Sequence, residues 1–234
     1  MIDTLRILDA TPDLLAQLYD EILASAFSED ELDGPWWLDG LDEEVPALVA
    51  VDERRRVVGG VVGEWYGEGR VLLIAYLAVR ADARDQGLGR KLMSEVERRW
   101  VPRFEPLLML GEIEDPRHYA GDDAERRVRF YDRLGAQALV MPYFQPRLRP
   151  TANRVYHVLL CVLGSSPEAR RDGGVDARVV RSFLEAYIEV CEGGDAARSP
   201  DAELRWLLES AAGKEIPLVP LAQYLEVPDT DPPG

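Results

Sequence analysis

A short polar segment of the chain combines residue types that could bind an anion. The apolar stretch 71–79 leads into a turn with the pattern Arg84-x-x-Gly87-x-Gly89, and an amphipathic helix is predicted to begin there. The first backbone N–H groups of a helix have no partner within it, and the helix dipole favours negative charge at that end. The glycines keep side chains off this backbone, and Arg84 and Arg90 add positive charge. The segment therefore predicts a phosphate site, with a plain tight turn as the alternative.

This turn differs from two widespread phosphate-binding loops. It lacks the Lys-Ser/Thr ending of the loop that binds nucleoside triphosphates. It also lacks the glycine spacing of dinucleotide-binding folds, and it does not follow the first strand of the chain. Neither of those ligand classes is predicted.

Two carboxylates extend an alternating strand pattern farther along the chain. Every second position is occupied by Leu108, Leu110, Glu112 and Glu114, which would share one face of a strand. A carboxylate at the end of an apolar strand is poorly hydrated, which makes it a better proton acceptor. Such a group suits a general base. A solvated strand end is the alternative for both glutamates.

The glycine turn and a second motif together resemble a known protein family. The sequence Leu77-Ala78-Val79 followed by Arg-x-x-Gly-x-Gly is similar to the acetyl-CoA motif of the GNAT superfamily of N-acetyltransferases. Downstream, the segment 129–136 resembles the family's Tyr-x-x-x-Gly-Phe signature, although Ala136 replaces the usual aromatic residue. The two motifs stand in the family's order. The resemblance implies a GNAT fold and an acyltransferase that uses acetyl-CoA.

The resemblance also implies which residues bind this cofactor. The pyrophosphate of coenzyme A would lie on the glycine turn and contact mainly backbone N–H groups. The pantetheine arm would pair, like an extra strand, with the end of the apolar stretch. The implied cofactor-binding residues are Leu77, Ala78, Val79, Arg84, Asp85, Gln86, Gly87, Leu88, Gly89 and Arg90.

Catalytic and acceptor-binding residues are implied in the same way. Tyr131 matches the family tyrosine that can protonate the departing thiolate, with a helix-packing tyrosine as the alternative. Several GNAT enzymes carry a glutamate at the position of Glu112, so Glu112 ranks before Glu114 as the base, and water alone is the third option. The implied substrate-binding residues are Trp36 and Trp37, which follow the first helix, and Tyr143, which lies near the last two strands.

The implied reaction is the transfer of an acetyl group from acetyl-CoA to a primary amine of a small molecule, by direct attack in a ternary complex. The alternatives are a protein N-acetyltransferase that acts on an α-amine or a lysine, and a CoA-binding sensor or scaffold without turnover. No metal ion is required. The chain has two histidines, and we expect His118 to be a loop residue without a role and His157 to be structural.

The predicted elements stand in the order that this fold requires. Strand and helix patterns alternate, which gives an α/β (α+β) fold with a mixed central sheet of about six to seven strands flanked by helices. The predicted strands cover 4–8, 46–51, 57–66, 71–79, 107–112, 138–144 and 154–163. The main helices cover 87–100, ended by Pro102 and Pro106, and 124–134. We predict a GNAT domain over 1–163, a linker over 164–174 and a docked C-terminal helical extension over 175–234.

Composition and charge exclude some partners. The 234 residues include 27 Lys and Arg against 43 Asp and Glu, a net charge of -16. A protein that binds a phosphate backbone needs a basic surface, so no nucleic acid partner is predicted. No apolar run is long enough for a membrane helix and no secretory signal follows Met1, so we expect no membrane association. Cys161 and Cys191 lie in apolar segments, which fits a reduced, cytoplasmic location. Dimers are common in the families it resembles, so a homodimer is one expected assembly.

Overall fold

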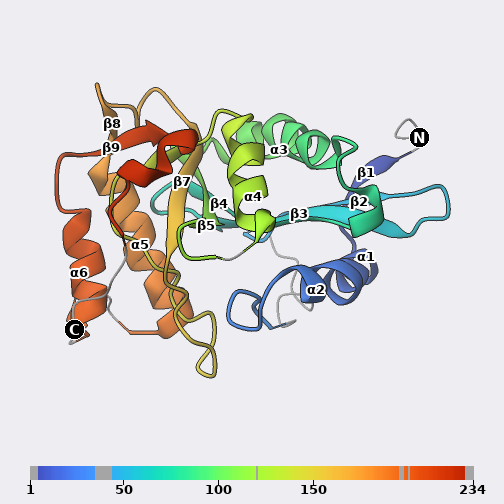
Figure 1. Cartoon of the computed structure of the whole chain (residues 1–234), viewed down its shortest axis with the longest axis horizontal. Helices are drawn as coiled ribbons and strands as arrows, with labels where there is room; N and C mark the ends of the chain where they lie inside the picture. Colours follow the sequence, from blue (N-terminus) through green and yellow to red (C-terminus); the bar gives the residue numbers. More distant parts are fainter. Residues whose placement is uncertain (1–4, 35–43, 120, 195–197, 200, 230–234) are drawn as a thin grey trace. The chain divides into compact units, whose positions relative to one another are not determined.

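A computed structural model describes residues 5–34, 44–119, 121–194, 198–199 and 201–229 (Figure 1). The chain divides into two compact units. Unit 1 comprises Met1–Trp65 and Leu72–Glu105, and unit 2 comprises Tyr66–Val71 and Pro106–Gly234. Both units combine strands with helices, so the fold class is α/β, as predicted.

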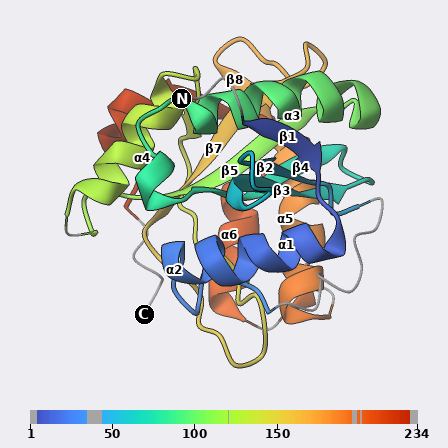
Figure 2. The same cartoon turned by 90° about the vertical axis from the view of Figure 1, so that its right-hand side faces the viewer.

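Unit 1 contains four strands and the helices that cover them. Its elements are β1 (Arg6–Asp9), α1 (Pro12–Leu18), the π-helical turn η1 (Tyr19–Leu23), α2 (Ala24–Ala26), β2 (Ala47–Val51), β3 (Val57–Tyr66), β4 (Val71–Val79), the 3-10 turn η3 (Ala81–Ala83) and α3 (Leu88–Phe104). The strands lie in the order β1-β2-β3-β4, and β1–β2 and β2–β3 are antiparallel pairs. α1 and α3 cover opposite faces of these strands (Figures 1 and 2).

Glycines in β3 allow both helices to approach the sheet closely. A Cβ on Gly60 would lie 2.5 Å from the side chain of Leu18 in α1, and a Cβ on Gly63 would lie 2.9 Å from Trp100 in α3. The two glycines are an odd number of residues apart, so they face opposite sides of the strand. A larger residue at either position would push a helix off the sheet.

Local sequence signals set the helix ends in unit 1. Thr11 caps α1, because its hydroxyl oxygen accepts a hydrogen bond from the N–H of Leu14. α3 continues to Phe104, with Pro102 inside its last turn, so Pro106 is the one of the two predicted stops that lies beyond its end. The residue before a proline avoids the right-handed α region, which stops the helix before Glu105. Glu105 has a left-handed φ of 47°, and its N–H donates to the carbonyl of Val101.

The described part of unit 2 continues with a second set of strands and their helices. Its elements are β5 (Leu108–Glu114), α4 (Asp122–Asp132), β6 (Gln137–Leu139), β7 (Val158–Ser165), β8 (Gly174–Asp176), α5 (Ala177–Glu192), α6 (Ala202–Ser210), β9 (Glu215–Pro220) and the 3-10 turn η5 (Leu221–Glu226). The strands lie in the order β5-β7-β6-β9-β8, and each neighbouring pair is antiparallel.

The two faces of β5 meet different helices. Ile113 is buried in a cluster with Val128 of α4 and Cys161 of β7. The neighbouring residue of a strand points to the opposite face, and there Glu112 is contacted by Tyr187 of α5. α5 is therefore the helix that reaches the predicted base.

The sheet is larger than predicted. The described residues form nine strands, against the predicted six to seven, because β8 and β9 lie in the stretch 175–234 or at its edge, where we expected helices alone. β9 was missed because Pro217 and Pro220 donate no ladder hydrogen bond and so argue against a strand. The predicted strands 138–144 and 154–163 are the shorter β6 and the later β7. The boundaries at 163 and 174 stay a prediction.

None of the helices in the described ranges has the length and apolarity that a membrane span requires.

Candidate active site

The predicted phosphate site lies in unit 1, where β4 is followed by the start of α3. Gly87 precedes this helix, and no side chain caps its first turn. The N–H of Lys91 bonds to the carbonyl of Gly87 at 3.1 Å. In the part of the chain that the structure describes, no acceptor is found for the N–H groups of Leu88, Gly89 and Arg90. The helix start therefore offers three backbone donors to an anion.

The turn before α3 leaves these donors accessible. Asp85, Gln86 and Gly87 are exposed, and a Cβ built on Gly87 would meet no atom within 4 Å. Asp85 and Gly87 have left-handed φ values of 59° and 79°, a conformation found in the backbone turns that bind anions. Arg84 ties the turn to the strand, since its Nε donates to the carbonyl of Val79 at 3.1 Å. The geometry fits a phosphate or diphosphate group.

In unit 2, three side chains hold the carboxylate of Glu112. The hydroxyl of Tyr143 donates to Oε1 at 2.5 Å, the amide of Gln145 donates to Oε2 at 3.2 Å, and the hydroxyl of Tyr187 donates to Oε2 at 3.3 Å. Tyr143 and Tyr187 are 1% and 2% exposed. Buried donors on both oxygens fix the orientation of the Glu112 carboxylate.

Aromatic packing positions the hydroxyl of Tyr187. Its ring stacks on Phe183 with centroids 5.3 Å apart, and Tyr66 meets the rings of both residues edge-on at 5.2 and 5.8 Å. A rigid ring of this kind carries a polar group at its tip at little cost in conformational entropy. α5 thus contributes a fixed donor to the Glu112 site.

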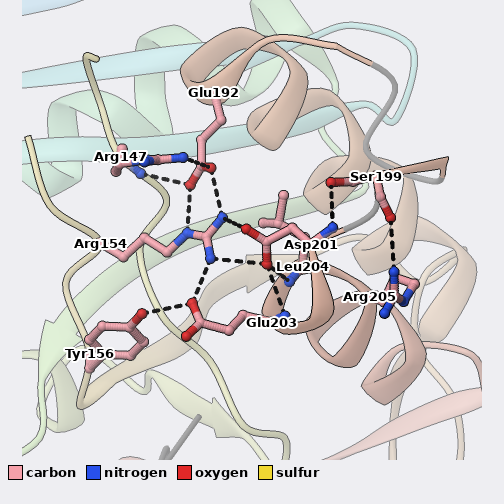
Figure 3. Close-up of polar contacts among 9 residues, drawn as sticks. All are labelled: Arg147, Arg154, Tyr156, Glu192, Ser199, Asp201, Glu203, Leu204 and Arg205. Atoms are coloured by element: carbon pink, nitrogen blue, oxygen red, sulfur yellow. Dashed lines mark hydrogen bonds and ion pairs between the residues drawn. The ribbon is translucent and has the colours of Figure 1, made fainter. Parts of the chain in front are cut away.

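The loop between β6 and β7 supplies the other two donors. Gln145 and Val155 exchange two backbone hydrogen bonds, at 2.9 and 3.0 Å, which close the loop into a narrow hairpin. Gln145 is 8% exposed. Arg154, directly before Val155, anchors this loop to the C-terminal helices (Figure 3).

Arg154 is the centre of a buried ion cluster (Figure 3). Its guanidinium is 8% exposed and lies 2.8 Å from Glu192, 2.8 Å from Asp201 and 2.5 Å from Glu203. Burial alone would raise the pKa of Glu192, yet hydrogen bonds from Arg154 and Arg147 bring it below its ordinary value. The Arg154 hydrogen bond likewise lowers the pKa of Asp201. The cluster joins the loop to the end of α5 and the start of α6.

Tyr131 lies in α4 with its ring 4.9 Å from that of Phe130. Burial raises the pKa of Tyr131, so the phenol keeps its proton at neutral pH. Among the residues that the structure describes, this hydroxyl has no hydrogen-bond partner. The hydroxyl of Tyr131 is thus available to donate its proton.

Glu114 is engaged elsewhere. Its carboxylate lies 2.6 Å from Arg127, and the side chain is 14% exposed. A carboxylate paired with a guanidinium is a weaker base, because the positive charge stabilises its ionised form. This pairing favours Glu112 over Glu114.

The structure brings some predicted residues together and leaves others apart. Glu112 and Tyr143 share a hydrogen bond, whereas Glu114 and Tyr131 have other surroundings in unit 2. The predicted cofactor residues form the end of β4, the turn and the first turn of α3. Trp36 and Trp37 lie outside the described residues.

Sequence reasoning missed two residues of the Glu112 site, Gln145 and Tyr187. Tyr187 was part of an apolar helical stripe in the sequence. A tyrosine in such a stripe needs a partner for its hydroxyl when it is buried. Its presence in the stripe could therefore have predicted a polar group opposite this helix.

Comparison with known proteins identifies the domain. The acetyltransferase (GNAT) domain family matches residues 44–135, which include the glycine turn, Glu112 and Tyr131. Residues 44–135 are a GNAT domain. The chain therefore carries a GNAT acetyltransferase domain over these residues, as the sequence predicts.

Solved structures agree on the fold. A GNAT-family protein from Bacteroides thetaiotaomicron is 17% identical, with a TM-score of 0.57, over 78% of this chain and 98% of that one. A protein from Acinetobacter baylyi ADP1 assigned to the acetyltransferases is 18% identical, with a TM-score of 0.52, over 72% and 97%. At identities this low, the similarity shows a shared GNAT fold and does not extend to activity. No curated protein sequence matches the chain.

The residues of the turn fit the acyl-CoA that GNAT enzymes use. Its diphosphate needs several N–H donors and nearby positive charge. The open start of α3 provides the donors. Arg90 and Lys91 are exposed, so both charges are available to an anion.

Proposed function

We propose that this GNAT domain transfers an acetyl group from acetyl-CoA to the primary amine of a small molecule. The observation that carries the proposal is the set of open backbone donors at the start of α3, in a chain that matches the GNAT family. Acetyl-CoA supplies an activated acyl thioester when bound. The backbone of Leu77, Ala78 and Val79, at the end of β4, would bind its pantetheine arm.

Glu112 would act as the base. An amine is mostly protonated at neutral pH and must lose a proton to attack. Glu112 takes that proton, and its oriented carboxylate also holds the amine nitrogen in place. The acceptor nitrogen then forms a bond to the acyl carbon as the carbon–sulfur bond breaks.

Tyr131 would act as the acid. The departing thiolate needs a proton, and the phenol of Tyr131 still holds one because burial raises its pKa. The attacking nitrogen loses its second proton to solvent when the amide forms, and Tyr131 regains a proton from solvent. Each turnover thus takes two protons from the nitrogen, the first through Glu112, and gives one to the thiolate through Tyr131, and it needs no covalent intermediate on the chain.

The charge of the chain supports a cationic acceptor, because a net charge of -16 attracts cations at long range. A pocket of about 460 Å³ in unit 2 is lined by the loop between β6 and β7 and the start of α6. That volume lies within the range of small-ligand pockets. Its wall carries Arg147 and Arg154 as well as Asp201 and Glu203, so its charges favour neither sign of ligand.

The acceptor class can be tested with a thiol-release assay. The purified chain is given acetyl-CoA and one of three acceptor sets: small primary amines, a peptide with a free α-amine, or a peptide with an internal lysine. We expect thiol release with members of the first set. Release only with peptides would replace the small-molecule acceptor, and acetyl-CoA binding without release in any set would favour a sensor.

A valine at Gly87 tests the phosphate site. The left-handed φ of Gly87 strains a β-branched residue, and the added methyl groups would fill the open space over the turn. We expect Gly87→Val to weaken acetyl-CoA binding at least about tenfold in calorimetry. Gly193→Val is the matched control, because Gly193 has a φ of 75° and equally open space. Equal affinities of the two variants would move the phosphate site elsewhere.

Tyr131→Phe tests the acid. Removal of the hydroxyl should lower kcat by about tenfold or more and leave acetyl-CoA affinity unchanged, because the ring still packs. Tyr224→Phe is the control, since Tyr224 packs against the same buried cluster. A kcat equal to that of the control would remove Tyr131 from the mechanism.

A further inference from the structure

The two histidines of the chain come together in unit 2. His118 follows β5, and His157 directly precedes β7. Their rings are stacked, with centroids 3.7 Å apart and 13° between the planes. With two histidines in 234 residues, this contact sets the site apart from the rest of the surface.

Asp229 completes the cluster from the far end of the described chain. Its Oδ1 lies 2.8 Å from Nε2 of His118 and 3.4 Å from Nδ1 of His157. All three ligand atoms lie within 4.8 Å of one another. Bonds of about 2.0–2.2 Å at tetrahedral angles place two ligand atoms about 3.3–3.6 Å apart. The 3.4 Å between Asp229 and His157 already suits one ion, and the 2.8 Å between Asp229 and His118 would have to lengthen.

His157 has features that packing does not explain. Its Nδ1 is buried and makes no hydrogen bond within the described residues, and the Asp229 carboxylate, 3.4 Å away, is its ion-pair partner only if the imidazole is protonated. Its φ of 59° is left-handed, and such strain in a residue other than glycine concentrates at functional sites. The hydrogen bond from the N–H of Asp115 to its carbonyl, at 2.9 Å, holds the backbone in place.

We propose that His118, His157 and Asp229 bind a divalent transition-metal ion such as Zn²⁺. Two imidazole nitrogens and one carboxylate oxygen are donors that suit zinc. The three side chains are 27%, 29% and 43% exposed, so water can take the fourth position. The ring planes are nearly parallel, so the His118 ring, on the loop after β5, must turn for both nitrogens to face the ion.

The ion would join three segments of unit 2. The loop after β5 already contacts the C-terminal stretch through Arg117, whose Nη1 donates to the carbonyl of Val227 at 3.2 Å. A metal bond to Asp229 would secure this contact and the start of β7 together. The site is thus a structural tie, and the proposal does not depend on the acetyltransferase reaction.

Zinc binding by the full chain tests the proposal. After removal of metal with a chelator, titration with ZnCl₂ in a calorimeter should give one strong site, and Zn²⁺ should raise Tm. Co²⁺ should give the visible absorption bands of a tetrahedral site. Asp229→Asn, at an exposed position, should weaken Zn²⁺ binding at least about tenfold and remove most of the Tm shift. His118→Gln should do the same.

Glu226→Gln is the matched control, because Glu226 is an exposed carboxylate of the same stretch. It should bind Zn²⁺ as the unchanged chain does. Absence of a strong site in the unchanged chain, or equal binding by the Asp229 variant and the control, would overturn the proposal. Neither result would bear on acetyl transfer, which is measured separately.

Discussion

Glu112→Gln should lower kcat about 100- to 10,000-fold, the usual contribution of a general base. Glutamine has the shape of glutamate, and its carbonyl oxygen can still accept the hydrogen bond from Tyr143. It cannot take a proton from an ammonium group. The loss should therefore appear in kcat, with acetyl-CoA affinity in calorimetry unchanged.

A pH profile separates this role from a structural one. In the unchanged chain, kcat/KM should fall on the acid side as the base becomes protonated, and Glu112→Gln should remove that limb. Glu114→Gln is the control: Glu114 shares the strand but is paired with Arg127, so it should keep both the limb and most of kcat. A Glu112 variant that behaves like the Glu114 variant would leave water alone as the base.

The phosphate site and the Glu112 site differed in how far the sequence could predict them. The phosphate site is local: strand, turn and helix start are contiguous, so Arg84, Gly87 and Gly89 could be assigned from their spacing. The support of Glu112 is not local, since its donors come from a loop and from α5. Glutamate could be placed on a strand face by alternation, but spacing cannot identify partners brought in by tertiary packing.

The same contrast holds for the fold. β3 and β4, which are rich in apolar and β-branched residues, have the bounds that the sequence predicts. β9 was not predicted, because Pro217 lies within it and a proline argues against a strand. In the structure, pairing with β6 outweighs this local preference. The cluster of the stacked histidines and Asp229 was not predicted for a related reason. Neither histidine has a motif around it, and only the fold brings them to Asp229.

Arg154→Met should lower the free energy of unfolding by about 3–5 kcal/mol, the usual cost of removing one partner from a buried ion cluster. Methionine retains much of the apolar stem but leaves Glu192, 4% exposed, beside Asp201 and Glu203 with less opposing charge. Urea unfolding measures the loss. Arg147→Met is the control, because Arg147 is 47% exposed and pairs at the rim, where a pair contributes about 0–1 kcal/mol.

The sign of the pH effect follows from the two carboxyl groups. Their pKa values are lowered in the folded chain from 4.5 for Glu192 and 3.8 for Asp201. The stability they contribute is therefore present above those values and lost as the pH falls below them. Arg154→Met should remove this acid-side loss, so that the two chains differ most at neutral pH and converge in acid.

A double variant separates the buried charge from the packing. If the cost of Arg154→Met comes from the stranded Glu192 carboxylate, then Arg154→Met with Glu192→Gln should recover part of the lost stability. Full additivity of the two losses would instead assign the cost to packing of the arginine stem.

Because Arg154 anchors the loop that carries Tyr143 and Gln145, the single variant should also lower kcat, and the double variant should restore activity in step with stability. Recovery of stability without recovery of kcat would mean that this cluster does not position the loop for Glu112.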